Sequence, residues 1–338
     1  MGAQSRVISG VLAVVCCVGA TACGGSNGDD GGGGGNSSGT TAAATALPTA
    51  APATVQATPI GPRVQARFDM PGEPDGLVAT AGSLWVIKAT GTVVRIDPAT
   101  NTEIASIPGG PQGEGCQGFG ASESAVWSCL GDGIVRIDPA TNAVVATLPI
   151  VKTFDQVHLP VVSDRVWVLT GDGSTLTGIA DDAVDSEIQL GARCTDLAGT
   201  DTEIWAICPF TAEVVRVDTD TSEVTARVAG FEDVRRIAAG DAIWVGFRGG
   251  VARIDPESAE VTGVADAAPG TQGDIAAMPE AVWVRAEGRF LRRIDPETLD
   301  VVEELSAPEA SGGAVLQAYG SLWATAYNDN VMYRLTPQ

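Results

Sequence analysis

Short runs of alternating apolar and polar residues fill most of the chain from about residue 63 onward. Typical runs are 76–80, 84–88, 93–97 and 103–107, and each is bounded by Gly, Asp, Asn, Thr or Pro residues that favour turns. Alternation with a period of two predicts half-buried strands. Because such runs return in the same order along the chain, the pattern predicts a repeated unit with an inner, a second, a third and an outer strand.

A tryptophan marks the second strand of every repeat. Each tryptophan follows a small or polar residue and then an aliphatic one, as in Ser83-Leu84-Trp85, and successive tryptophans lie 38 to 42 residues apart. The series comprises Trp85, Trp127, Trp167, Trp205, Trp244, Trp283 and Trp323, which are all the tryptophans of the chain. A repeat of this length with four short strands is typical of a propeller blade. We therefore expect an all-β fold, a seven-bladed β-propeller of four-stranded antiparallel blades over residues 63–338.

The beginning of this region supplies a strand that the last repeat lacks. The chain ends after the third strand of the seventh repeat, whereas residues 64–72 match the outer-strand sequence at 103–109. We therefore expect the N-terminal strand to complete the last blade, which closes the ring and removes an open sheet edge.

The third strand carries a recurrent Arg-x-Asp pair, often followed by Pro. Residues two apart on a strand face the same side, so Arg95 and Asp97 could be mistaken for part of a binding ladder. Their recurrence in most repeats favours contacts between or within blades instead, and Asp-Pro predicts a hairpin turn. Blade three departs from the pattern at residues 177–180. In blade four, 218–221 resembles a calcium loop but lacks its Gly and Glu.

The first 62 residues differ in composition from the repeats. Residues 1–22 are typical of an export signal, with Arg6 as the only charge and an apolar run that is too short to span a bilayer. Cys23 follows Ala-Thr-Ala and resembles the lipidated cysteine of a bacterial lipoprotein; plain secretion with an unpaired thiol is the alternative. Residues 23–62, rich in Gly, Ala, Thr and Pro, predict a disordered tether. We expect an extracytoplasmic protein that is lipid-anchored to the outer face of the bacterial cytoplasmic membrane.

Charge and cysteine spacing narrow the possible partners. The net charge of -22 repels nucleic-acid phosphates and anionic lipid headgroups, so we expect no nucleic-acid partner and membrane contact only through the lipid anchor. Cys116 and Cys194 each lie eleven residues before a blade tryptophan, whereas Cys129 and Cys208 lie two and three residues after one. These matching places favour the disulfides Cys116–Cys129 and Cys194–Cys208. A zinc site is the alternative, although the chain has no Cys-x-x-Cys motif and one histidine.

The blade motif resembles the YVTN-type and virginiamycin B lyase-like seven-bladed propellers of bacteria. It consists of Gly-Ser-Leu-Trp-Val at 82–86, Val-Val-Arg-Ile-Asp-Pro-Ala-Thr-Asn at 93–101 and an outer strand ending near Pro-Gly-Gly-Pro-Gln-Gly at 108–113. The resemblance covers residues 63–338. It implies either binding and scaffold roles or the activity of a metal-assisted lyase that opens a cyclic depsipeptide. That lyase depends on histidines in later blades around a magnesium site, and this chain has no histidine from blade four onward.

Residues that differ from blade to blade are the candidates for function. In a propeller the outer-to-inner loops and the second-to-third loops converge at one face around the central channel, which we call the loop face. The candidate ligand-binding residues there are Lys88, Asp155, His158, Arg235, Arg248, Arg285, Tyr327 and Asp329. His158 is the one histidine; it is interpreted either as a hydrogen-bonded residue at a strand end or as a general base.

The chain lacks the sequence signature of a known catalytic centre. It contains no Gly-x-Ser-x-Gly or His-Glu-x-x-His motif and no phosphate-binding glycine loop followed by a helix. We therefore expect a monomeric, non-catalytic binding or assembly module without a cofactor, whose partner is a peptide, a glycan or an envelope protein. The alternative is a metal-assisted lyase or hydrolase in which His158 and the carboxylates of Asp155, Asp274 and Asp329 act with a divalent metal.

Overall fold

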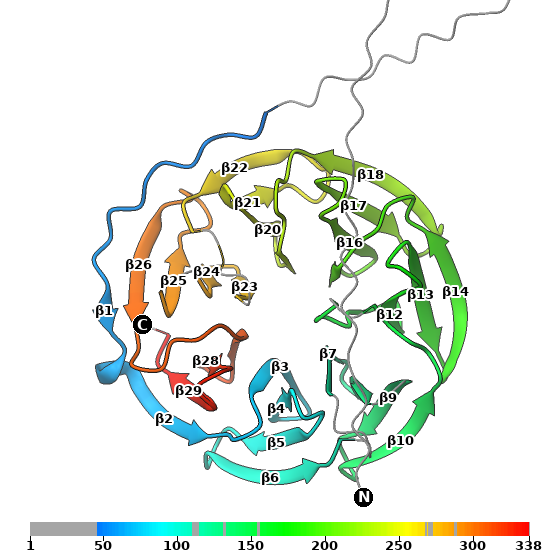
Figure 1. Cartoon of the computed structure of the whole chain (residues 1–338), viewed down its shortest axis with the longest axis horizontal. Helices are drawn as coiled ribbons and strands as arrows, with labels where there is room; N and C mark the ends of the chain where they lie inside the picture. The colour runs from blue at the N-terminus through cyan, green and yellow to red at the C-terminus, as the bar shows by residue number, and fades with distance from the viewer. Residues whose placement is uncertain are drawn as a thin grey trace, which may run out of the picture. The chain divides into compact units, whose positions relative to one another are not determined.

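The repeats fold into a ring of seven antiparallel sheets (Figure 1). The computed structural model describes residues 46–109, 115–130, 133–153, 156–267, 269, 273–286 and 289–337, with side chains omitted at 115–117 and 130. Within these ranges it holds no helix of the length and apolar character needed to cross a membrane. The signal, Cys23 and Asp155 lie outside the described residues.

Each blade has four strands, ordered from the channel outward. Blade one contains β3 (Pro74–Thr80), β4 (Ser83–Lys88), β5 (Val93–Asp97) and β6 (Thr102–Ile107); blade two contains β7 (Gly115–Ala121), β8 (Val126–Leu130), β9 (Gly133–Asp138) and β10 (Ala143–Leu148); blade three contains β11 (Val161–Val162), β12 (Arg165–Thr170), β13 (Thr175–Ala180) and β14 (Ala183–Gln189). Blade four contains β15 (Asp196–Gly199), β16 (Glu203–Cys208), β17 (Glu213–Asp218) and β18 (Glu223–Ala229); blade five contains β19 (Arg236–Ala239), β20 (Ile243–Phe247), β21 (Gly250–Ile254) and β22 (Val261–Ala265). Blade six contains β23 (Ile275–Met278), β24 (Ala281–Val284), β25 (Leu291–Ile294) and β26 (Val301–Ser306); blade seven contains β27 (Val315–Ala318), β28 (Ser321–Ala326), β29 (Val331–Leu335) and β2 (Val64–Asp69).

The N-terminal strand closes the ring, as the sequence predicts. β2 pairs antiparallel with β29 from Val64↔Leu335 to Asp69↔Val331 and is the outer strand of blade seven. Phe68 on β2 contacts Trp323 with 6.0 Å between ring centroids, and Met70 just beyond the strand is buried. Closure therefore joins the two ends of the repeat region through both hydrogen bonds and apolar packing.

The tryptophans are core residues. All seven are buried, and Trp85, Trp167 and Trp323 donate their indole N–H to a carbonyl five residues earlier in the chain, at the end of the inner strand. In most blades the third-strand residue opposite the tryptophan is an arginine. In five blades its guanidinium lies 4.9 to 6.0 Å from the indole centroid. Stacking on the indole fixes the arginine so that its end reaches toward the next blade.

These arginines link neighbouring blades, which confirms the interpretation of the Arg-x-Asp pairs as scaffold. Four of them donate to the carbonyl of the turn proline in the next blade: Arg334 to Pro98, Arg95 to Pro139, Arg216 to Pro256 and Arg253 to Pro296. At the joint of blades two and three, Arg136 instead forms two hydrogen bonds with the carboxylate of Asp182. We call these contacts the arginine latches.

Two joints depart from this scheme. Blade three has Gly178 opposite its tryptophan, and its link to blade four is a contact between the hydroxyls of Ser163 and Thr219 at 3.2 Å. In blade six Arg293 pairs with Glu303 of its own blade, and Arg63 binds the same carboxylate while donating to Pro337 O of blade seven at 3.1 Å. The N-terminal segment thus supplies the latch between blades six and seven.

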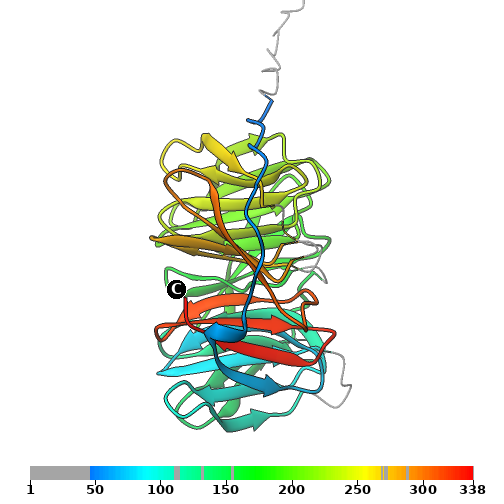
Figure 2. The ribbon, with the colours of Figure 1, turned by 90° about the vertical axis from the view of Figure 1, so that its left-hand side faces the viewer.

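Residues 46–60 correct the prediction of a disordered tether that extends to residue 62. This segment, which we call the strap, runs along the outside of the ring (Figure 2). Leu47 and Ala50 pack against the core of blades four and five, Ala53 and Val55 against that of blades five and six, and the Ala53 N–H donates to Asp266 Oδ2 at 2.7 Å.

The strap ends as a fifth strand of blade six. Its last residues form β1 (Thr58–Pro59), parallel to β26, and Ile60 is buried before a short 3₁₀ helix, η1 (Gly61–Arg63). The sequence gives little indication that the strap packs against the ring, because only scattered apolar residues of the strap contact the rim.

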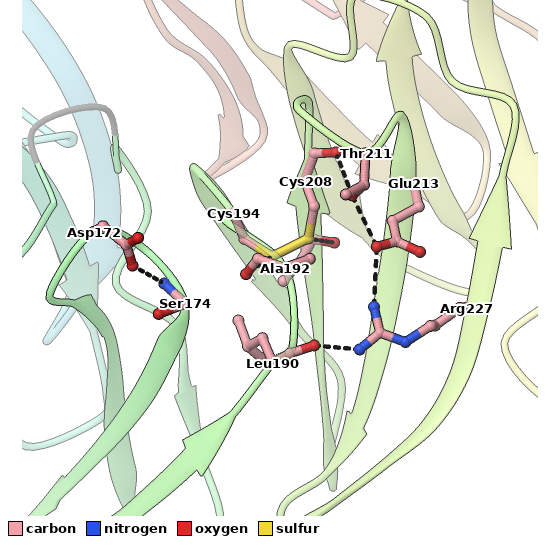
Figure 3. Close-up of a disulfide and its surroundings, with 10 residues drawn as sticks. Asp172, Ser174, Leu190, Ala192, Cys194, Cys208, Thr211, Glu213 and Arg227 are labelled. Carbon is pink, nitrogen blue, oxygen red and sulfur yellow. Dashed lines mark hydrogen bonds and ion pairs between the residues drawn. A yellow bond between two sulfur atoms is a disulfide. The ribbon is translucent and has the colours of Figure 1, made fainter.

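A disulfide joins Cys194 to Cys208, as predicted from the repeat positions (Figure 3). It connects the loop before β15 to the end of β16. Cys129 is also disulfide-bonded. The side chain of Cys116 lies outside the described residues, so its pairing with Cys129 stays a prediction.

Candidate functional site

One side chain from each of three blades meets at the channel. His158, Asp196 and Asp274 each lie nine residues before their blade's tryptophan, at or just before the start of the inner strand. His158 Nδ1 lies 2.9 Å from Asp196 Oδ2, and Nε2 lies 3.4 Å from Asp274 Oδ1. The one imidazole of the chain is therefore held between two carboxylates, one from blade four and one from blade six, and we call these three residues the channel triad.

The loop that carries His158 is fixed from both sides. Asp196 Oδ1 accepts the backbone N–H groups of Val157 at 3.3 Å and His158 at 3.0 Å. The buried Gln156 amide donates to His158 O at 2.6 Å and accepts from the Leu169 N–H at 2.8 Å. Asp196 thus orients both the ring and the backbone of His158, and it is itself almost completely buried.

The channel triad favours a charged imidazole. Burial opposes protonation of His158, but the carboxylates of Asp196 and Asp274 outweigh it and raise the pKa of His158 well above 6.5. Burial acts to raise the pKa of Asp274, yet the charges of His158 and Arg236 lower it below its usual value. The two carboxylates therefore favour the imidazolium form of His158.

This arrangement is poorly suited to catalysis by His158. A general base or a metal ligand needs a neutral imidazole with a free nitrogen lone pair, and here both ring nitrogens face carboxylates. Within the ranges that the structure describes, no group of three or more His, Cys, Asp or Glu residues is arranged to hold a metal ion. A small cavity of about 30 Å³ on the loop-face side of the triad, also lined by Asp75, Phe119 and Arg236, has room for a single water.

The structure brings together only part of the predicted site. His158 contacts Asp274, one of the proposed channel carboxylates, whereas Asp196 was not predicted as a site residue. The signal for Asp196 was its spacing, nine residues before a tryptophan as in His158 and Asp274. Asp155 cannot be placed because it lies outside the described residues.

The other predicted residues contact neither His158 nor one another through the described side-chain hydrogen bonds and ion pairs. Lys88 is half-buried at the end of β4, Arg235 donates to Asp233 at 2.6 Å and to Pro269 O, and Arg248 is 70% exposed beside Glu232 and Asp233. Burial and the nearby Glu73 raise the pKa of Tyr327 to about 12. Asp329 accepts the Ser311 N–H at 3.0 Å and so caps a loop.

Arg285 has a structural role rather than the expected ligand-binding one. It is buried, stacks on Phe290 at 4.3 Å from the ring centroid, and donates to the carbonyls of Phe290 and Ser311. Burial lowers its pKa to about 9, although the charges of Asp274 and Asp329 act in the opposite direction. These contacts bind the β24–β25 loop to the β26–β27 loop.

A second feature of the loop face is an exposed aromatic residue. Phe210, in the turn between β16 and β17, is 65% exposed, and the guanidinium of Arg193 lies 4.4 Å from its ring centroid. Arg193 precedes Cys194, and Phe210 follows Cys208 by two residues, so the disulfide joins the two loops that carry the pair. The exposed hydrophobic side chain is therefore presented rigidly.

Comparison with known proteins supports the fold. Virginiamycin B lyase from Staphylococcus aureus aligns with a TM-score of 0.63 and 16% identity over 81% of this chain and 99% of the other. The WD40 propeller domain of Doa1 aligns at 0.66 with 13% identity, over 82% and 97%, and BamB from Moraxella catarrhalis at 0.56 with 12% identity, over 81% and 99%. No protein-family model and no curated protein sequence matches. The chain thus shares the β-propeller fold of these proteins.

Proposed function

We propose that this protein is a non-catalytic binding module whose loop face recognises a peptide or a partner protein, with Phe210 and Arg193 as the anchor. The observation that carries the proposal is the exposure of Phe210 on a loop held by a disulfide. Aromatic and arginine side chains dominate binding energy at protein interfaces, and a rigid anchor loses little conformational entropy on binding. Arg248, exposed on blade five, extends the same face.

Two observations favour binding over the lyase alternative. Both nitrogens of His158 face carboxylates, which disfavours the neutral imidazole that a base or a metal ligand requires. The resemblance to the lyases is one of fold, since their sequence identity to this chain is 15 to 16%.

The binding role can be tested with the propeller from residue 46 onward as bait in envelope extract. We expect a partner that the wild-type protein retains and the double variant Phe210→Ala/Arg193→Ala loses. Val184→Ala, on the outer strand β14, is the control because it also removes an exposed apolar side chain. Equal capture by all three proteins would place the interface elsewhere and contradict the proposal.

The lyase alternative has a separate test. Calorimetric titration with magnesium or manganese should show no saturable site that depends on His158. Saturable uptake that His158→Ala abolishes, together with turnover of a cyclic depsipeptide, would establish an enzyme.

We also propose that Cys23 is lipidated and anchors the protein to the outer face of the cytoplasmic membrane. The support is the cysteine at the predicted cleavage site, behind an apolar export signal. Metabolic labelling with a fatty acid should mark the wild-type protein, and Cys23→Ser should remove the label and release the protein from membranes. An unlabelled wild-type protein in the culture medium would indicate plain secretion.

A further inference from the structure

The channel contains a second cavity beyond the channel triad, which we call the chamber. It encloses about 300 Å³, at the lower end of the range for small-molecule sites. All seven inner strands line it, chiefly with small and apolar residues such as Ala121, Ala198, Ala239 and Ala277. Small side chains on the inner strands leave this space open.

The charged residues of the chamber lie at one of its ends. His158 and Asp274 lie at the start of the inner strands and line both the chamber and the small cavity on the loop-face side. Met278 and Gln317 lie at or near the opposite ends of their strands. Because inner strands run in the same direction in every blade, the charged floor lies toward the loop face, and the end lined by Met278 and Gln317 lies toward the opposite face.

The charge of the floor favours a cation. With His158 protonated, it and the two carboxylates of Asp196 and Asp274 carry a net charge of -1. Arg236 and Asp75, on the loop-face side of the floor, carry opposite charges, as do Arg285 and Asp329 nearby. Among the residues that the structure describes, His158 and Asp274 are the charged ones that line the chamber.

Asp274 has an oxygen available for a ligand. Its Oδ1 accepts the Ile275 N–H at 2.8 Å and faces His158 Nε2 at 3.4 Å. Its Oδ2 receives no hydrogen bond from the described residues. An ammonium group at this oxygen would neutralise the floor, and the apolar walls would cover an attached ring or short chain.

We propose that the chamber is a binding site for a small organic monocation with an apolar body, such as an arylalkylammonium ion. The site is separate from the proposed interface around Phe210. It needs no metal or cofactor, and Asp274 is its recognition residue.

Benzylammonium is a suitable probe, with benzyl alcohol as the neutral molecule of matching shape. Because the chain has one histidine, a single set of imidazole NMR signals reports on the floor directly. We expect a saturable shift of the His158 signals and a matching calorimetric isotherm with benzylammonium. Benzyl alcohol should bind at least about tenfold more weakly, since a hydrogen bond to a charged group is worth that much.

Two variants and a control sharpen the test. Asp274→Asn should weaken benzylammonium binding at least about tenfold, and Ala239→Leu should block it by filling the chamber. Asp201→Asn, an exposed carboxylate elsewhere, should bind like the wild type. Thermal unfolding of each variant checks that it folds.

The proposal is overturned by any of three results: no saturation with the amine at millimolar concentration, equal binding of the alcohol, or undiminished binding by folded Asp274→Asn. Phe210→Ala/Arg193→Ala should leave amine binding unchanged, and Ala239→Leu should leave partner capture unchanged. The two sites can thus fail independently.

Discussion

Two positions recur in every blade and behave in opposite ways. On the rim side, the third-strand residue opposite the tryptophan is Arg95, Arg136, Gly178, Arg216, Arg253, Arg293 and Arg334 in turn. On the channel side, the residue two positions before the tryptophan's partner on the inner strand is Gly76, Gly118, His158, Asp196, Arg236, Asp274 and Ala314. The first position is an arginine in six blades, whereas the residue type at the second position differs in almost every blade.

The difference reflects what each position must do. Every joint needs a link between blades, and an arginine stacked on the tryptophan supplies it at most joints. The channel residues point toward a shared axis, where identical charges in every blade would repel one another. Unequal residues can instead pair across the channel, as His158 does with Asp196 and Asp274.

Ring closure should have the largest effect on the scaffold. We predict that a protein starting at Gly72 loses its cooperative unfolding transition, because β29 is left unpaired and the Arg63 latch and buried Ile60 are removed. Circular dichroism during thermal denaturation measures this. A melting temperature equal to that of the intact ring would show that closure is dispensable.

Removal of the disulfide should have the next largest effect on stability. Replacing both cysteines in Cys194→Ser/Cys208→Ser should lower the free energy of unfolding by about 3 kcal/mol, since a 14-residue separation gives a loop-closure term of that size. Urea denaturation provides the value. The same variant should weaken partner capture through Phe210, whereas a change in stability alone would mean that the loops keep their places without the bond.

The arginine latches should have a smaller effect that depends on the joint. Arg95→Ala should cost about 2 kcal/mol, because it removes charged hydrogen bonds to Pro139 O and Asn142 and the contact with Trp85. Arg165→Ala in blade three removes an exposed ion pair within one blade and should cost about 0.5 kcal/mol. If urea denaturation gave the same loss of unfolding free energy for both variants, the distinction between an arginine latch and a surface ion pair would be refuted.

The channel should have an effect on stability of a different kind, because it should depend on pH. The raised pKa of His158 makes its pairing fully stabilising below about pH 6.5, and this contribution is lost as the pH rises through the folded-state pKa. The variant His158→Gln should therefore be less stable than the wild type at low pH. This difference in the free energy of unfolding should decrease as the pH rises. NMR titration of the imidazole should show a lower pKa in both Asp196→Asn and Asp274→Asn, and an unchanged pKa in either would remove that carboxylate from the channel triad.

The repeat made much of this molecule predictable. The tryptophan spacing gives seven blades, the match between 64–72 and 103–109 gives the closing strand, and the cysteine positions give the pairing of Cys194 with Cys208. Each prediction rests on matching positions in two or more repeats. The sequence also points to His158 and Asp274, because they lie at channel positions where the residue type differs from blade to blade.

The strap and the channel triad followed from neither composition nor local pattern. Residues 46–60 contain too few apolar residues to show a period, and their docking depends on grooves that exist only after blades four to six have assembled. The spacing of Asp196 before its tryptophan marks it as a channel residue, but only the assembled ring places it beside His158.

The sequence by itself determined the blade, the number of blades and the strand that closes them, because these follow from periodic burial and turn chemistry within each repeat. Only the tertiary structure decided which of the non-repeated residues meet. Side chains about 40 residues or more apart come together at the channel because the ring points every inner strand at one axis.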